Sequence, residues 1–191
     1  MRRLILPVVA AATLSACLPG GRDLPPTLAT LTPSTPAPEN IDRLSDPENA
    51  VTVEMPIVPQ ALQADRIPVH VGPTAIAYVT DAIWIDRPAP LFRQLVSETI
   101  ARRTRRVVLE PAQGVAQAGL RVTGTLHHFG YHADTREAVV VYDAAIRRNG
   151  VVETRRFEAR GPADGTAATV PAALNAAANE VAVQVADWIG G

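Results

Sequence analysis

The uneven distribution of aromatic residues and prolines most limits where this chain can build a hydrophobic core. All eight aromatic residues lie between Tyr78 and Trp188, whereas residues 18–49 contain seven prolines and no aromatic residue. Such a proline-rich segment cannot bury enough apolar surface to offset the entropy lost on ordering. We therefore predict one folded domain over residues 50–191 after a flexible tether over residues 17–49. The tether would span from about 30 Å as a coil to roughly 100 Å when extended.

The N-terminus has the pattern of a bacterial export signal. Two arginines precede an apolar stretch of about ten residues, too short for a transmembrane helix, which needs roughly 20. Leu14-Ser15-Ala16-Cys17 follows directly and resembles the lipobox of bacterial lipoproteins. We predict that cleavage between Ala16 and Cys17 removes the signal peptide, residues 1–16, and that the sulfur of Cys17 is acylated.

Acylation of Cys17, for example with palmitate, would anchor the protein to a membrane. Each buried methylene contributes about 0.8 kcal/mol, so three acyl chains of about 15 carbons give on the order of 30 kcal/mol of gross transfer energy. Leu18, not aspartate, follows the cysteine, which favours the outer over the inner membrane, at the periplasmic face of the envelope. The alternative is an ordinary signal peptide followed by an incidental cysteine.

Apolar periodicity predicts strands and two helices in the remaining chain. Apolar and polar residues alternate as in strands over 51–57, 67–71 and 120–126. Residues 75–79 and 139–146 are further extended candidates, and 107–109 is typical of a short buried strand. Helical periodicity follows Pro88 over residues 91–102 and starts again at Pro171, where the apolar stripe runs from Leu174 to Trp188. These patterns predict the α/β class: a single domain in which a mid-chain helix and a C-terminal helix pack on a mixed β-sheet.

The Asn-Gly pair at 149–150 is the strongest turn signal, because both residues tolerate positive φ. A two-residue turn fixes the register of its hairpin and places Tyr142 opposite Phe157 and Asp143 opposite Arg156. We predict that Tyr142 and Phe157 face the helices, and that Asp143 and Arg156 lie on the other face.

Four arginines crowd the end of the mid-chain helix: Arg102, Arg103, Arg105 and Arg106. In one interpretation their charge stabilises the negative pole of the helix, by about 0.3 kcal/mol or more each. In the other, they contact phospholipid headgroups or an acidic partner, because a guanidinium matches phosphate oxygens in pairs.

Charge and motifs argue against a nucleic-acid-binding protein or an enzyme. Eighteen basic and 19 acidic residues give a net charge of −1, without the basic excess that phosphate contacts need. The sequence has no nucleophile elbow, no Ser-x-x-Lys and no glycine-rich phosphate loop, so we expect no catalytic residue. His127, His128 and His132 are candidate metal ligands, but adjacent strand residues point to opposite faces. We therefore expect no metal and no cofactor beyond the lipid on Cys17.

Several short segments follow one another in an order that resembles a known family. They are Leu62-Gln63-Ala64-Asp65-Arg66, Ile83-Trp84 before Pro88, the helix over 91–100, Leu126 to Phe129, the strand from Phe157 into Gly161-Pro162, and the helix ending in Trp188-Ile189. Together with the lipobox, this order resembles the ABC-type transport auxiliary lipoproteins, the PqiC-like family that works with MCE proteins. Ile85 after Trp84 departs from the small or acidic residue expected there.

The resemblance implies a non-enzymatic α/β domain with a role in phospholipid transport between the inner and outer membranes. We predict an auxiliary or docking subunit that is held to the membrane by acylated Cys17 and binds an MCE-domain protein and an ABC permease and ATPase; self-association is left open. The alternative is a lipoprotein cofactor that activates or assembles another envelope machine, for cell-wall synthesis or outer-membrane assembly. Trp84 is either a core anchor or a contact for a partner or lipid.

Overall fold

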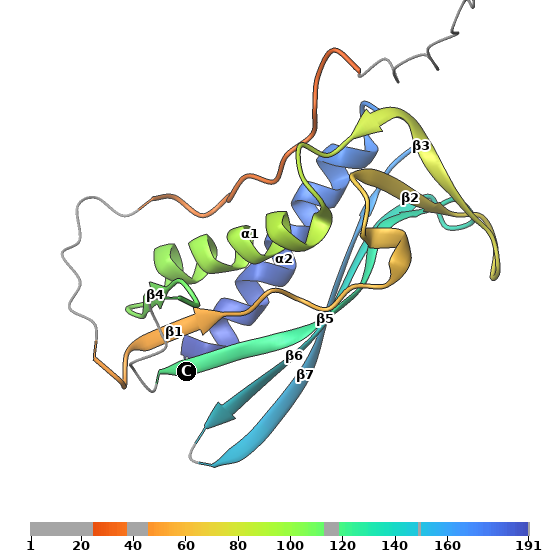
Figure 1. The fold of residues 1–191 in the computed structure, drawn as a ribbon. Helices are drawn as coiled ribbons and strands as arrows, with labels where there is room; N and C mark the ends of the chain where they lie inside the picture. Colours follow the sequence, from red (N-terminus) through yellow and green to blue (C-terminus); the bar gives the residue numbers. More distant parts are fainter. Residues whose placement is uncertain (1–24, 38–45, 113–118, 149, 191) are drawn as a thin grey trace, which may run out of the picture.

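The strands of the chain form one mixed sheet, and two long helices pack together on one face of it (Figure 1). The computed structural model describes residues 25–37, 46–112, 119–148 and 150–190. The elements are β1 (Ala50–Val53), the 3-10 helix η1 (Gln60–Leu62), β2 (Arg66–His70), β3 (Ile76–Ile83), α1 (Pro88–Arg103), β4 (Val107–Leu109), β5 (Leu120–His132), β6 (Glu137–Arg148), β7 (Val151–Pro162) and α2 (Val170–Gly190). They confirm the predicted α/β class, with a mid-chain and a C-terminal helix on a mixed sheet.

The long strand β5 joins two groups of strands that are distant in the sequence. Along one edge it pairs antiparallel with β6. Along the other edge its first residues pair in parallel with β1, Val51 beside Leu120, and its last residues pair in parallel with β2, His70 beside His132. β1 also pairs in parallel with β4, and β2 pairs antiparallel with β3. The C-terminal end of β5 therefore lies beside β2, whose residues come about sixty positions earlier in the sequence. Such a long connection is typical of parallel pairs.

The β6–β7 hairpin has the register that its turn predicts. Tyr142 pairs with Phe157, and Asp143 pairs with Arg156. Tyr142 and Phe157 are buried on the face toward the helices, whereas the Asp143 carboxylate accepts hydrogen bonds from Arg156 Nε and Nη2 at 2.6 Å each. Both predictions for this hairpin, its register and its two faces, are confirmed.

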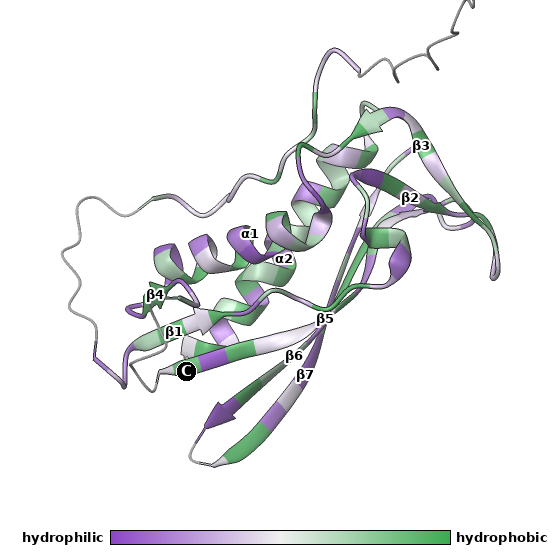
Figure 2. Cartoon of the chain, viewed as in Figure 1, coloured by the Kyte–Doolittle hydropathy of each residue, from purple (hydrophilic) through white to green (hydrophobic). Residues whose placement is uncertain are grey.

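The helices bury the stripes that the sequence predicts. Proline is favourable in the first turn of α1, because its missing N–H would have no intrahelical partner there. The buried residues of the α1 stripe are Leu91, Phe92, Leu95, Val96, Thr99 and Ile100, and those of the α2 stripe are Leu174, Ala177, Ala178, Val181 and Val185. Figure 2 shows polar residues, in purple, on α1, whereas α2 is mostly apolar along its length. Both helices cover the sheet, and their buried residues belong to one continuous hydrophobic core.

The first predicted strand is shorter than its alternation suggests. β1 ends at Val53, and beyond it Met55 is 50% exposed and Ile57 is 71% exposed. Pro56 lies between them and has no N–H with which to continue the ladder. The chain still follows β5 irregularly, since Ile57 N–H donates to Gly124 O at 2.9 Å.

Residues 29–35, which we call the strap, lie alongside α1 and α2, in red to orange in Figure 1. Ala29 forms a parallel bridge with Trp84, and Leu31 packs against the core. The sequence predicts a flexible tether up to residue 49, and for the strap this prediction is wrong. A segment that cannot build a core of its own is held here by side chains of the two helices, so the boundary predicted at residue 50 leaves out an ordered part of the domain.

Candidate functional site

Two asparagines of α2 hold the strap by its backbone. Asn175 Oδ1 accepts from Thr32 N–H at 2.9 Å, and Asn179 Oδ1 accepts from Ser34 N–H at 2.7 Å. Asn179 Nδ2 in turn donates to Thr32 O at 2.9 Å. The side chain of Asn179 is 5% exposed, so these bonds also satisfy a buried amide that would otherwise be unfavourable.

The two ends of the strap are attached to other elements. Ala29 N–H donates to Ile83 O at 2.9 Å, and Ile85 N–H donates to Ala29 O at 2.8 Å, as in one more short strand. At the other end, Arg102 Nη1 donates to Thr35 O at 2.7 Å. This binding site for an extended segment was not predicted from the sequence. Its signal there is the pair of asparagines at 175 and 179, which are one helical turn apart and lie on the same side of the helix.

The arginines at the end of α1 are engaged within the domain. Arg102 pairs with Glu98 as well as the strap, and Arg103 binds the carboxylate of Asp187 with Nε at 2.5 Å and Nη2 at 3.0 Å. These bonds lower the pKa of Asp187 and raise the pKa of Arg103. Arg106 Nε donates to Ile189 O at 2.8 Å, which satisfies a carbonyl in the last turn of α2.

The ends of α1 and α2 enclose a hollow of about 550 Å³, into which these arginines bring positive charge. Arg103, Arg105 and Arg106 line it together with Glu48 and Asp187. Burial, and next the charge of Arg148, lower the pKa of Arg106. Since Arg103 and Arg106 already bind partners inside the domain, exposed Arg105 is the member of the group that best fits an external contact; the contact with headgroups or an acidic partner stays a prediction.

Trp84 lies in the core, beside the helix as one of its two interpretations requires. Its side chain is 1% exposed, and its ring centroid lies 5.5 Å from that of Phe129. The alternative candidate role, direct contact of Trp84 with a partner or lipid, is wrong in this structure because no face of the indole reaches the surface. Its neighbour Ile85 is 62% exposed.

Three histidines meet at the end of β5, but they are not the three neighbours in the sequence. His127 faces Asp143, with Nε2 3.0 Å from Oδ2. His128 and His132 of β5 instead meet His70 of β2, and one ring nitrogen of each lies within 4.8 Å of the others. Strict alternation along a strand would place His127 and His128 on opposite faces, but a register irregularity lies between Leu126 and His128. Regular strand geometry therefore does not apply at these two residues.

The surroundings of His70 and His128 disfavour the charged form of their imidazoles. Burial, then the neighbouring His132 and His128, lower the pKa of His70, while Asp134 opposes this shift. Burial, then His132, also lower the pKa of His128. His70 was missed by the sequence analysis, since only the parallel pairing of β2 with β5 brings it to the other two.

Ala16 and Cys17, the predicted cleavage and lipidation residues, lie outside the described residues. Among the residues that the structure does describe, no helix combines the length and the apolar character needed to cross a bilayer. The fold and its sites define a small α/β domain that binds its own N-terminal segment across two helices.

Comparison with known proteins places this domain in a family. The family model described as "ABC-type transport auxiliary lipoprotein component" matches residues 30–186, so the chain belongs to that family. The match begins within the strap, which agrees with an ordered domain that starts before residue 50. Members of the family are lipoproteins that serve as auxiliary components of ABC-type transport. No curated protein matches the chain.

Two solved structures share the fold. Protein XCC0632 from Xanthomonas campestris, of the family DUF330, has a TM-score of 0.66 at 16% identity, over 87% of this chain and 93% of that one. The crystal structure of an uncharacterized protein has a TM-score of 0.65 at 12% identity, over 85% of this chain and 99% of that one. At these identities the similarity establishes the fold alone.

Proposed function

We propose that this protein is an acylated, non-catalytic docking subunit of an MCE-type ABC transporter that moves phospholipids between the inner and outer membranes. The observation that carries the proposal is the family match over residues 30–186, which makes the chain an auxiliary lipoprotein of ABC-type transport. The lipobox-like Leu14-Ser15-Ala16-Cys17 supplies an attachment point that agrees with this family. Acylated Cys17 would hold the domain at the periplasmic face of the envelope, more readily at the outer than at the inner membrane.

The strap supports a docking role because it shortens the stretch of chain between the predicted anchor and the domain. The backbone groups of Thr32, Ser34 and Thr35 bind Asn175, Asn179 and Arg102 of the two helices, so the free part of the predicted tether ends before the strap. A partner bound to the domain is then positioned relative to the membrane more narrowly than a long free tether would allow.

Copurification tests the proposed partners. The full chain, tagged at its C-terminus and extracted in detergent from its own cells, should retain an MCE-domain protein together with an ABC permease and ATPase. Recovery of a cell-wall synthase or an outer-membrane assembly complex in their place would favour the alternative cofactor role. Absence of every MCE or ABC subunit would contradict the proposal.

A Cys17→Ser variant tests the anchor separately. Mass spectrometry of the mature wild-type protein should show residues 1–16 removed and acyl chains on Cys17, with the protein in the outer-membrane fraction. Cys17→Ser should lose both the acyl mass and the mature N-terminus, because the cysteine sulfur is the acyl acceptor. An unmodified sulfur in the wild type would overturn the anchor.

A further inference from the structure

The three histidines at the end of β5 have the arrangement of a ligand set. His70 and His132 are direct neighbours in the parallel β2–β5 register. His128 lies four residues before His132, so both side chains project from the same face of β5. The ring centroids of His70 and His132 are 4.6 Å apart, and those of His70 and His128 are 5.2 Å apart. Two strands thus bring three imidazoles together, with His70 and His132 stacked and His128 edge-on to His70.

Two ring nitrogens of this group are buried without a hydrogen-bond partner among the described residues: His128 Nδ1 and His132 Nε2. Buried polar nitrogens are nearly always bonded, so such atoms in a folded protein call for a ligand or water. One ligand that can satisfy several of them at once is a metal ion, because a neutral imidazole offers one nitrogen lone pair.

We propose that His70, His128 and His132 bind a divalent metal ion of the Zn²⁺ type. Imidazole ligands suit Zn²⁺, Cu²⁺ and Ni²⁺, whereas Ca²⁺ and Mg²⁺ prefer oxygen. Three protein ligands leave the fourth tetrahedral position to water or to a group from another molecule, as in Zn²⁺ sites that stay open. Asp134, two residues beyond the end of β5 at His132, brings a negative charge to the same end of the sheet.

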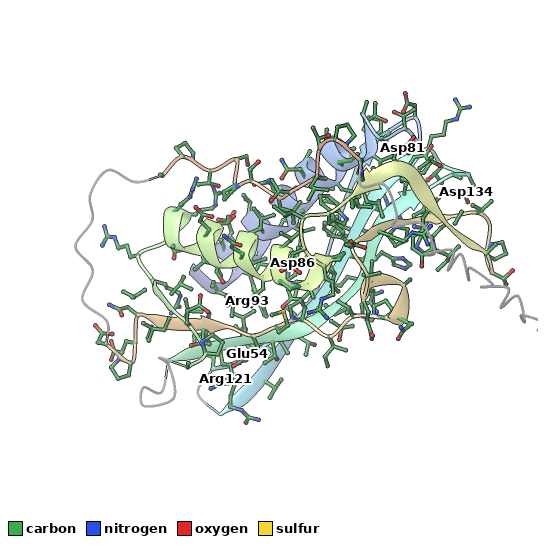
Figure 3. The ribbon with its side chains drawn as sticks, turned by 45° about the horizontal axis from the view of Figure 1, so that its top comes forward. Glu54, Asp81, Asp86, Arg93, Arg121 and Asp134 are labelled. Atoms are coloured by element: carbon green, nitrogen blue, oxygen red, sulfur yellow. The ribbon has the colours of Figure 1, made fainter. Side chains whose placement is uncertain are left out.

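The geometry is close to that of a bound ion. Zn–N bonds of about 2.0–2.1 Å in a tetrahedral site put ligand nitrogens about 3.3 Å apart. The nitrogens here lie within 4.8 Å of one another, so the rings must turn about their side-chain bonds to reach that spacing around an ion. Figure 3 shows Asp134 at the end of the sheet opposite to Glu54 and Arg121, which form an ion pair of their own.

His127 provides a matched control, because it is adjacent to His128 but bonds to Asp143 instead of joining the cluster. The full chain, purified in detergent without a histidine tag, is titrated with ZnCl₂ against a chromogenic chelator. We expect one Zn²⁺ per chain for the wild type and for His127→Ala. We expect His70→Ala and His132→Ala to weaken binding by about 100-fold or more, since even loss of a residue beyond the direct ligands weakens metal affinity by about 10- to 100-fold.

Two further measurements keep the proposal open to refutation if a variant folds poorly. His70→Gln and His132→Gln keep similar volume, and their melting curves in chelator should match the wild type. Co²⁺ should give the visible absorption of a tetrahedral site with wild type and His127→Ala but not with these variants. No Zn²⁺ binding by the wild type, equal affinity in His132→Gln, or a loss in His127→Ala as large as in His132→Gln would each overturn the proposal.

Discussion

The β6–β7 hairpin and the strap are both extended segments whose backbone groups are hydrogen-bonded, yet the partners of those groups are specified in opposite ways. The hairpin pairs residues that are nested around one two-residue turn, from Arg148 beside Val151 outward. The strap binds partners 143 to 147 positions away, through asparagine side chains on a helix. The comparison teaches that local turn chemistry can set a long register, whereas a segment without such a turn acquires its conformation from whatever surface receives it.

The largest expected effect comes from Trp84, which links the strap to the core beneath the helices. Its backbone bridges Ala29 of the strap and its ring packs against Phe129 of β5. Trp84→Ala should lower the free energy of unfolding by about 3–5 kcal/mol, because it leaves a large cavity in the core. Thermal melting followed by circular dichroism should therefore show a much lower melting temperature for the whole domain.

Trp84→Phe is the control for that change. It keeps an aromatic ring beside Phe129 and removes an indole N–H that has no partner among the described residues, so its loss of stability should be much smaller. A Trp84→Ala protein that melts like the wild type would show that the indole does not support the core.

A change at Asn179 should have an intermediate effect, because it should loosen the strap without loosening the β6–β7 hairpin. Asn179→Ala removes the acceptor for Ser34 N–H and the donor to Thr32 O. Leaving such groups unpaired costs about 1–3 kcal/mol. Hydrogen exchange followed by mass spectrometry should accelerate in residues 29–35 while the β6–β7 amides keep their protection.

Gln184→Ala is the matched control for Asn179, because Gln184 is an amide on the same helix that bonds to Glu180 and not to the strap. It should leave exchange in residues 29–35 unchanged. Equal exchange of the strap in wild type and Asn179→Ala would mean that the asparagine does not hold it.

The smallest effect lies within the hairpin, at Asp143. The hydrogen bond from Arg156 lowers the pKa of Asp143, and His127 adds to this shift. A lowered pKa in the folded state stabilises the fold above the ordinary value of 3.8, and this contribution disappears as the pH falls through the lowered pKa. Asp143→Asn should therefore melt slightly below the wild type at pH 7.

The gap between the two melting temperatures should narrow as the pH is lowered below about 4, and it should close once the pH falls below the lowered pKa, where the carboxyl of the folded protein becomes neutral. Differential scanning calorimetry of both proteins across this range measures it. A gap that stays constant in acid would mean that the pair contributes through packing and not through charge.

The sequence allowed the hairpin and both helices to be predicted because their signals are local. The Asn-Gly pair at 149–150 determined which residues face each other, and the spacing of Leu91, Leu95 and Thr99 determined which side of α1 is buried. β1 is the local failure, since its alternation continued through Met55 and Ile57 although Pro56 interrupts the ladder.

The strap and the histidine cluster could not be predicted, because each depends on pairings that no local pattern announces. The prolines in and around the strap indicate that this segment has no core of its own, but they do not indicate that its backbone would bind Asn179. His70 reaches His132 only through the parallel pairing of β2 with β5, and the register irregularity before His128 changes which side its neighbour faces.

The attachment of Ala29 to the sheet also limits the distance between the domain and an acylated Cys17. If Cys17 carries the acyl chains, only eleven residues lie between it and Ala29, the first strap residue bonded to the sheet. A fully extended chain of that length reaches about 40 Å at most, well under half of what the whole predicted tether would allow. The attached part of the domain would then stay within about 40 Å of the lipid surface, however long the rest of the predicted tether is.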